Sequence, residues 1–527
     1  MSKISEQRLY QFIAAGQAPL LKGSLIGLEK ETLRVSPDGV IAQTPHPAAL
    51  GSALIHPYIT TDYSEALLEF VTPPFGDLRD TLRFLSDCHQ FVYRKVGEEM
   101  LWATSMPCVV EGETSIPIAR YGSSNAGLMK HVYRVGLGYR YGRIMQVIAG
   151  VHFNFSLPEE FWPVFQAQQN DPRPLRDFIS ESYFCLIRNL QRFGWLIPYL
   201  FGASPAVCKS FLAGRPTTLA EFDANTYFEP YATSLRMSDI GYTNSREKKT
   251  GLAVSYNSLA EYLASLTWAI QTPCPNYEKI GVKVNGEYRQ LNANILQIEN
   301  EYYSSMRPKQ VPQGNEKPIL GLQRRGVRYV ELRSLDVNPF DPLGVNEDQL
   351  RFLEAFLIHC LFHDSPPIGA EERKAIDHNL MAAANRGRDP ALRLQCAGHT
   401  RSLRSWALEI VDSLQMACEV LDTGHTGHTD RRYASVLHRQ REVILDPNRT
   451  PSARVLAEMR AAGEAFFHFA KRVSLQHQAY FRALPMAAER VQDFTDEARR
   501  SLQRQQELEA ADTLPFDEYL RQYFAQS

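Results

Sequence analysis

Four stretches of the chain alternate apolar and ionisable side chains with the two-residue period of a β-strand. They are GLEKETLRV (residues 27–35), the run 65–71 within ITTDYSEALLEFVTPP (59–74), which Asp62 precedes, GVHFNFS (150–156) and RYVELRSLD (328–336). Successive side chains of a strand point to opposite faces, so each stretch has one mainly apolar face and one face with acids, His, Asn or Arg. This pattern predicts antiparallel strands with one face packed in a core.

From about residue 345 onward the apolar residues recur at spacings of three and four, which predicts helices. The runs cover residues 348–362, 402–421, 452–473 and 494–511, and a Gly, His and Asp cluster at 423–432 separates the second from the third. We therefore expect an α+β catalytic body over residues 1–345. A helical C-terminal region over residues 346–527 is expected to pack on it, so that the two form one structural unit.

The overall charge gives no sign of a nucleic-acid or membrane partner. Lys and Arg number 57 and Asp and Glu 59, a net charge of −2, which leaves small molecules as the expected partners. The N-terminus lacks the pattern of a secretory signal, and the longest apolar run, residues 195–203, is about half of a membrane span, so a cytoplasmic location is expected. The eight cysteines form no C-x-x-C pair and predict no disulfide framework.

The polar faces of the predicted strands carry the ligands that hard cations prefer. A solvated face would mix in Lys, Thr and Gln, whereas these faces offer Glu29, Glu31, Asp62, Glu69, Glu331 and His152. Mg²⁺ binds carboxylate oxygens together with substrate phosphates, and this set would suffice for two or three ions that share ligands. The alternative is a group of unrelated surface acids, because one sequence does not show that the strands are neighbours.

Nucleotide phosphates would need other partners, because the chain has neither a G-x-x-x-x-G-K-[ST] loop nor a G-x-G-x-x-G turn. Arg236 and Arg333 are the candidates, since the planar guanidinium suits phosphate and carboxylate. Either one could equally form an ion pair inside the acidic group.

Seven blocks of sequence carry a resemblance to a known family. In order they are GLEKETLRV, ITTDYSEALLEF, MQVIAGVHFNFSLP, WLIPYLFGASPA, SLRMSDIGYTN, LQIENEYYSSMRPK and RGVRYVELRSLDVNPF. In this order and spacing they resemble the proteobacterial type of glutamate–cysteine ligase, also called γ-glutamylcysteine synthetase. The likeness covers residues 20–345 closely, and in the C-terminal third it is clearest at ELEAADTLPF, Glu507–Phe516.

The resemblance implies a glutamine-synthetase-like fold, in which a curved, mainly antiparallel sheet has the active site on its concave face and helices outside. It also implies a reaction: ATP activates the γ-carboxylate of L-glutamate as γ-glutamyl phosphate, and the amine of L-cysteine then gives γ-glutamylcysteine, the first step of glutathione biosynthesis. Two or three Mg²⁺ ions, with Mn²⁺ as a substitute, are the implied cofactors. A monomer with feedback inhibition by glutathione is expected.

The resemblance also assigns roles to residues. It gives the metal ligands as Glu29, Glu31, Asp62, Glu69, His152 and Glu331, and it places Arg333 and Arg236 on the transferring phosphate and substrate oxygens. Gln146 and Asn154 would hold glutamate. The cysteine pocket would be formed by Tyr63, Tyr133, Leu137, Tyr242 and Tyr303, with Arg236 near the cysteine carboxylate. Tyr63 stands where close relatives have Phe. Without the resemblance, Tyr133 and Leu137 would be read as core residues of one helix face.

Other interpretations compete with this one. The nearest is another glutamate–amine ligase of the same fold, which would differ in the aromatic pocket. A bifunctional enzyme that also makes glutathione is disfavoured, because the region after residue 345 is helical and too short for a second ATP-binding ligase domain. A helical interaction protein leaves the acidic strands unexplained, and a hydrolase would need a G-x-S-x-G elbow, which is absent.

A zinc site is a separate, disfavoured hypothesis. Cys396, His399, His425 and His428 form C-x-x-H and H-x-x-H pairs, the composition of a four-ligand site. The second pair lies in a Gly- and Thr-rich loop, and the family gives no reason for zinc there.

Overall fold

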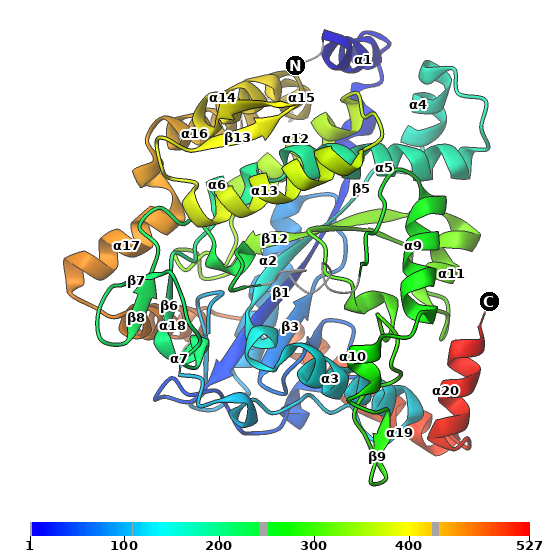
Figure 1. Cartoon of the computed structure of the whole chain (residues 1–527), viewed down its shortest axis with the longest axis vertical. Coiled ribbons are helices and arrows are strands. Elements are labelled where there is room, and N and C mark those ends of the chain that lie inside the picture. The colour runs from blue at the N-terminus through cyan, green and yellow to red at the C-terminus, as the bar shows by residue number, and fades with distance from the viewer. Residues whose placement is uncertain (1–2, 108, 242–250, 424–431, 527) are drawn as a thin grey trace.

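An antiparallel sheet crosses the centre of the molecule in the computed structural model, which describes residues 3–107, 109–241, 251–423 and 432–526 (Figure 1). Its strand order is β11-β12-β5-β1-β3-β2, and β4 pairs with one end of β1. The strands are β1 (Leu25–Val35), β2 (Ile59–Thr61), β3 (Leu67–Val71), β4 (Met100–Leu101), β5 (Gly150–Ser156), β11 (Met306–Lys309) and β12 (Tyr329–Asp336). All pairings are antiparallel.

The register of the sheet brings the ionisable residues into neighbouring positions. Glu31 of β1 lies opposite Glu69 of β3, and Glu29 lies opposite His152 of β5. Glu331 of β12 lies opposite Arg307 on the edge strand β11. Directly opposite residues of an antiparallel pair point to the same face, so the strands build one ionisable surface.

Helices account for most of the remaining chain. The structure has α1 (Lys3–Ala14), α2 (Leu78–Tyr93), α3 (Asn125–Tyr141), α4 (Phe161–Gln169), α5 (Leu175–Phe193), α6 (Leu196–Phe201), α7 (Lys209–Leu212), α9 (Leu259–Gln271), α10 (Pro275–Glu278), α11 (Pro318–Arg325), α12 (Glu347–Phe362), α13 (Ala370–Arg386), α14 (Leu403–Ser413), α15 (Gln415–Asp422), α16 (Arg432–Leu445), α17 (Pro451–Ala462), α18 (Phe466–Ala483), α19 (Ala488–Ala511) and α20 (Phe516–Ala525). Small sheets are formed by β6 (Ala206–Cys208), β7 (Ala220–Glu221) and β8 (Thr226–Phe228), by β9 (Lys283–Val284) and β10 (Glu287–Tyr288), and by β13 (Arg393–Cys396) and β14 (His399–Ser402).

Helices pack on the apolar face of the sheet, and the opposite, ionisable face lines a cavity. Helix α2 packs on β1 and β3, helix α5 packs on β11 and β12, and α12 packs against both helices. Every residue of α12 from Gln349 to Phe362 is buried, and a capping box between Asn346 and Gln349 fixes where the helix begins. The apolar side of the sheet is therefore packed in this core.

The α+β prediction is confirmed, but several element boundaries differ from the expected ones. The expected helix over 402–421 is interrupted at Leu414 between α14 and α15, and the one over 452–473 is interrupted at Gly463. Gly463 adopts φ 63°, a left-handed conformation that ends α17 at no steric cost. The strand predicted over the run from Glu65 to Val71 is β3, and Asp62 lies before it as predicted, in the turn of a hairpin with the additional short strand β2.

Residues 346–527 are mainly helical, and the β13–β14 hairpin is a difference from the predicted all-helical region. One continuous hydrophobic core includes Leu28 of β1 and Phe494 of α19, and the expected single structural unit stays a prediction. The division at residue 345 stays a prediction. Within the described part of the chain, no helix combines the length and the apolar character that crossing a membrane requires.

The described cysteines are free thiols, as predicted. Cys396 and His399 pair across the turn of the β13–β14 hairpin. The other two residues of the zinc hypothesis, His425 and His428, lie outside the described residues, so that hypothesis is untested.

The face of β1 that turns to the helices is less apolar than expected, because it carries two buried cations. Arg34 pairs with Glu99 at 2.7 Å, whereas Lys30 Nζ lies 2.8 Å from His89 Nε2. His89 Nδ1 lies 2.8 Å from the carbonyl oxygen of Leu85 and must donate to it, so Nε2 is left to accept from Lys30. Lys30 is 4% exposed, and burial lowers its pKa to about 7.

We expect Lys30→Met to stabilise the protein in a pH-dependent way. Between about pH 7 and the ordinary Lys pKa of 10.5, the unfolded chain binds a proton that the folded chain has lost, so the stability of the wild type rises with pH. The substitution removes this penalty but leaves His89 Nε2 unpaired. The free energy of unfolding by urea should rise by about 2 kcal/mol at pH 6.5 and by clearly less at pH 9.

The exposed Lys374→Met is the matched control and should change neither value. An equal gain for Lys30→Met at both pH values would contradict the assignment of a lowered pKa to Lys30.

Candidate active site

A cavity of about 540 Å³ lies on the ionisable face of the sheet, within the usual size range of small-molecule sites. Strands β1, β3, β5 and β12 form its floor, and α3, α20 and the residues between Ile295 and Tyr303 contribute to its walls. The residues predicted from the sequence that line it are Glu29, Glu31, Asp62, Tyr63, Glu69, Tyr133, Leu137, Gln146, His152, Tyr303, Glu331 and Arg333. The structure therefore brings most of the predicted set together.

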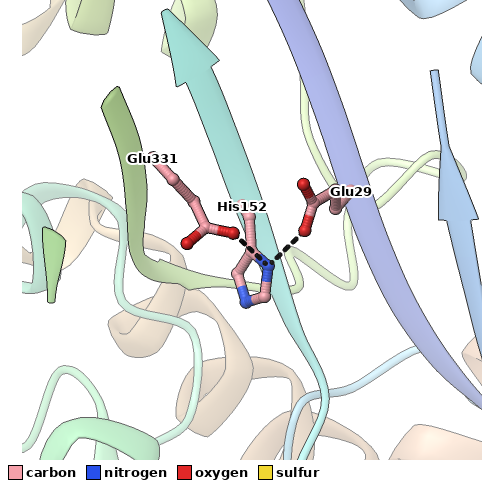
Figure 2. Close-up of side chains that lie close together, drawn as sticks. All are labelled: Glu29, His152 and Glu331. Carbon is pink, nitrogen blue, oxygen red and sulfur yellow. Dashed lines mark hydrogen bonds and ion pairs between the residues drawn. The ribbon is translucent and has the colours of Figure 1, made fainter. Parts of the chain in front are cut away.

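We call Glu29, Glu31, Asp62, Glu69, His152 and Glu331 the acidic cluster. Three of them, Glu29, His152 and Glu331, come from adjacent strands and point at one another (Figure 2). His152 Nδ1 lies 3.0 Å from Glu29 Oε2 and 3.8 Å from Glu331 Oε1. One ligand atom from each residue falls within 4.8 Å of the other two. Two carboxylate oxygens and an imidazole nitrogen at this spacing form a set that can hold a divalent cation.

The surroundings of the Glu331 carboxylate suit a bound cation. It is 1% exposed, and neither of its oxygens accepts a hydrogen bond from a described residue, although Lys309 Nζ and Arg333 Nη1 approach to 3.2 and 3.3 Å. Burial alone would raise the pKa of Glu331, but Lys309, Arg333 and His152 outweigh it and lower the pKa well below its ordinary value. A buried, ionised carboxylate with unused lone pairs fits a metal ligand.

For Glu31 and Glu69, two other carboxylates of the cluster, nearby positive charge does not offset the effect of burial on the pKa. Burial raises the pKa of Glu69 well above its ordinary value, and the charges of Glu29, Asp62 and Glu31 raise it further. Burial also raises the pKa of Glu31, although one of its oxygens accepts from the Gly150 N–H at 2.7 Å. Like charges in one buried site oppose ionisation, so a bound cation would relieve this strain.

Two predicted residues, Asn154 and Arg236, are not among those that line the cavity. The Asn154 side-chain amide donates to Glu29 Oε1 at 2.9 Å, which orients that carboxylate. Arg236 is 1% exposed, donates to the carbonyl oxygen of Arg333 at 2.9 Å and lies 3.8 Å from Asp336. Tyr242 lies outside the described residues, and the roles of all three stay predictions.

The sequence did not single out several polar and aromatic residues that line the cavity. They are Lys130 and Arg134 on α3, Arg307 and Lys309 on β11, and Tyr519 and Tyr523 on α20. The Arg-Pro-Lys order gave a signal for β11, because Arg307 and Lys309 share a strand face and Pro308 suits an edge strand. No comparable signal distinguished the two tyrosines from ordinary core residues.

Comparisons with known proteins agree with this architecture. The family model described as glutamate-cysteine ligase matches residues 9–383. A glutamate–cysteine ligase of Azotobacter vinelandii is 50% identical over 528 residues, covering 100% of this chain and 99% of the relative. The crystal structure of glutamate–cysteine ligase from Francisella tularensis in complex with AMP has a TM-score of 0.89 at 36% identity, and it covers 95% of this chain and 97% of that one.

A bifunctional glutathione synthetase from Pasteurella multocida has a TM-score of 0.70 at 26% identity, and the match covers 90% of this chain but 55% of that longer one. The fold, the site and these likenesses define an ATP-dependent ligase. The chain belongs to the glutamate–cysteine ligase family, as the seven sequence blocks predicted.

We expect Glu69→Gln to stabilise the protein in the absence of divalent cations. The pKa of Glu69 is raised in the folded state, so the folded wild type holds a proton that the unfolded chain releases, and its stability falls as pH rises above the ordinary Glu value. With EDTA, the variant should gain about 1 kcal/mol over the wild type at pH 8 and little at pH 5.5. Mg²⁺ should stabilise the variant less than the wild type.

Chemical denaturation with and without Mg²⁺ measures both effects. Glu159→Gln, at an exposed carboxylate, is the control for a generic loss of charge. A metal-free Glu69→Gln protein that is less stable than the wild type at pH 8 would show that the cluster is not under repulsion.

Proposed function

We propose that this protein joins the γ-carboxylate of L-glutamate to the amine of L-cysteine at the expense of ATP. The products are γ-glutamylcysteine, ADP and phosphate, and the intermediate is γ-glutamyl phosphate. The reaction is the first step of glutathione biosynthesis. Membership of the glutamate–cysteine ligase family and the match to the AMP-bound relative support this assignment.

The observation that carries the proposal is the division of charge across the cavity. Glu29, Glu31 and Glu69 lie on β1 and β3, whereas Arg307, Lys309 and Arg333 lie on β11 and β12. A carboxylate and a triphosphate must meet during the reaction, and both are anions. A site with cation ligands on one side and fixed cations on the other suits this encounter.

We assign the metal ligands as Glu29, Glu31, Asp62, Glu69, His152 and Glu331, for two or three Mg²⁺ ions or for Mn²⁺ in their place. The grouping of Glu29, His152 and Glu331 supports one such position. When bound, the ions reduce the repulsion between the phosphates and the attacking carboxylate.

In the first step, a γ-carboxylate oxygen of glutamate attacks the γ-phosphorus of ATP and ADP leaves. Arg333 points its guanidinium into the cavity beside Glu331, where it can pair with the phosphoryl oxygens as charge moves onto them. Arg236 contacts the Arg333 backbone and would hold that strand segment and a substrate carboxylate in place. Gln146 on the cavity wall and Asn154 behind Glu29 would orient glutamate.

In the second step, the cysteine amine attacks the acyl carbon, phosphate leaves and the amine loses a proton. An acyl phosphate hydrolyses readily, so the site must exclude water until the amine is placed. Tyr63, Tyr133, Leu137 and Tyr303 line the cavity and would enclose cysteine, together with Tyr242. Small-molecule substrates, a monomeric state, a cytoplasmic location and inhibition by glutathione complete the proposal.

The direct test is phosphate release by the purified protein with MgATP, L-glutamate and L-cysteine, with the product identified by its mass. We expect γ-glutamylcysteine, and EDTA should abolish its formation. Glu29→Gln should lower kcat roughly 100-fold or more, because it removes one charge from the ligand set beside His152. Glu159→Gln, far more exposed, should retain wild-type activity.

The choice of amine separates this reaction from that of another glutamate ligase with the same fold. L-Cysteine, L-2-aminobutyrate and ammonium are offered in turn under the same conditions. A preference for ammonium, or phosphate release that ignores cysteine, would overturn the cysteine assignment while keeping the ligase chemistry.

A further inference from the structure

One wall of the active-site cavity is a segment with little regular structure. It comprises residues 289–303, immediately before β11, and its one helical turn is the 3₁₀ turn Glu299–Glu301. Ile295, Ile298 and Tyr303 of this segment line the cavity. Because the segment has neither a long helix nor a strand ladder, its shape must be fixed by other hydrogen bonds.

Arg140, in the last turn of α3, supplies several of these hydrogen bonds. Its side chain has no exposed surface. Nη2 donates to the Asn292 carbonyl oxygen at 2.7 Å, Nε donates to Gln290 Oε1 at 2.9 Å, and Nη1 donates to Glu301 Oε1 at 2.9 Å. The guanidinium also lies over the Tyr277 ring, 4.1 Å from its centroid. One planar cation thus ties points near both ends of the wall segment to α3.

Glu301 is the counter-charge of Arg140, and its side chain is equally inaccessible to solvent. Besides Arg140, its carboxylate accepts from the Tyr141 hydroxyl at 2.8 Å and from the Gln297 N–H at 2.7 Å. A buried carboxylate with three donors is held in one geometry, and removal of a donor leaves an oxygen short of a partner.

Gln297 brings the wall segment into close contact with α3. Its Nε2 donates to the Tyr133 carbonyl oxygen at 3.2 Å, and its Oε1 accepts from the Leu291 N–H at 2.9 Å. The approach requires glycine at position 136 of the helix, because a Cβ there would overlap the Gln297 side-chain amide. The wall segment and α3 therefore meet at a close, defined separation next to Leu137.

The two elements joined in this way are two sides of the proposed cysteine pocket. Tyr133 and Leu137 come from α3, whereas Tyr303 comes from the wall segment, two residues after Glu301. A pocket that accepts one side chain and rejects another that is a methylene longer must have walls that do not move apart, because a yielding wall accommodates both.

We propose that Arg140 and Glu301 are positioning residues that hold the two walls of the cysteine pocket at a fixed separation and so limit the size of the amine substrate. The inference rests on the proposed function, and it names the accepted class as α-amino acids whose side chain is no larger than that of cysteine. The pair acts through Leu137 and Tyr303, which enclose the substrate side chain.

The test is steady-state kinetics of the full chain with MgATP, L-glutamate and three amines: L-cysteine, L-2-aminobutyrate and L-norvaline, which is one methylene longer than L-2-aminobutyrate. Arg140→Lys keeps a positive charge beside Glu301 but loses the planar fork. It should raise the KM for cysteine roughly fivefold or more and lower the preference in kcat/KM for L-2-aminobutyrate over L-norvaline by a similar factor. The KM values for ATP and glutamate should stay within about twofold.

KM does not depend on how much of the protein is folded, so a folding defect alone would lower only the apparent kcat. Tyr141→Phe is a milder second variant, because it removes one donor to Glu301 and no charge, and it should shift the cysteine KM and the size preference in the same direction by less. Arg449→Lys, in an exposed ion pair with Glu442, is the matched control.

An unchanged cysteine KM and an unchanged size preference in both variants would overturn the inference. So would an equal rise in the KM values of all three substrates, because it would indicate a general distortion of the cavity. A wild-type protein that forms no γ-glutamyl product from cysteine would instead refute the proposed function.

Discussion

The repulsion among carboxylates on one face of the central sheet is the constraint around which the rest of the molecule is arranged. Glu31 and Glu69 lie opposite each other on paired strands, and their burial leaves each with a raised pKa. Such an arrangement persists only where the surrounding structure enforces it. Here the enforcement comes from the apolar face of the sheet, which is fixed by α2, α5 and α12.

The cations at the edge of the sheet divide the site into two electrostatic regions. Lys309 and Arg333 lower the pKa of Glu331 against the effect of its burial, whereas burial and the neighbouring carboxylates raise the pKa of Glu69 on the other side of the cluster. Carboxyl groups within one cavity thus have pKa shifts of opposite direction, because their charged neighbours differ. The asymmetry gives a direction to an incoming polyanion, because Arg307, Lys309 and Arg333 lie together on β11 and β12, whereas most of the carboxylates lie toward β1 and β3.

The strand periods predicted which residues face the cavity, because a two-residue alternation is a local property of the backbone. They did not predict which strands are neighbours: that Glu31 meets Glu69 follows from the register, which tertiary packing decides. Lys309 was missed although the Arg-Pro-Lys order is a signal, because β11 has only four residues and so short a strand does not establish a period by itself. Tyr519 and Tyr523 were missed because an amphipathic helix shows the same pattern whether it faces a core or a cavity.

The cavity wall draws on segments that span the described chain, from Glu29 on β1 to Tyr523 on α20. These segments meet only in the folded chain, so a partly unfolded chain lacks a complete cavity. Ligands that need the whole wall bind only the native state, and by mass action they draw the folding equilibrium toward it. Substrate binding thus stabilises the folded state of such a protein, in addition to supplying the reactants.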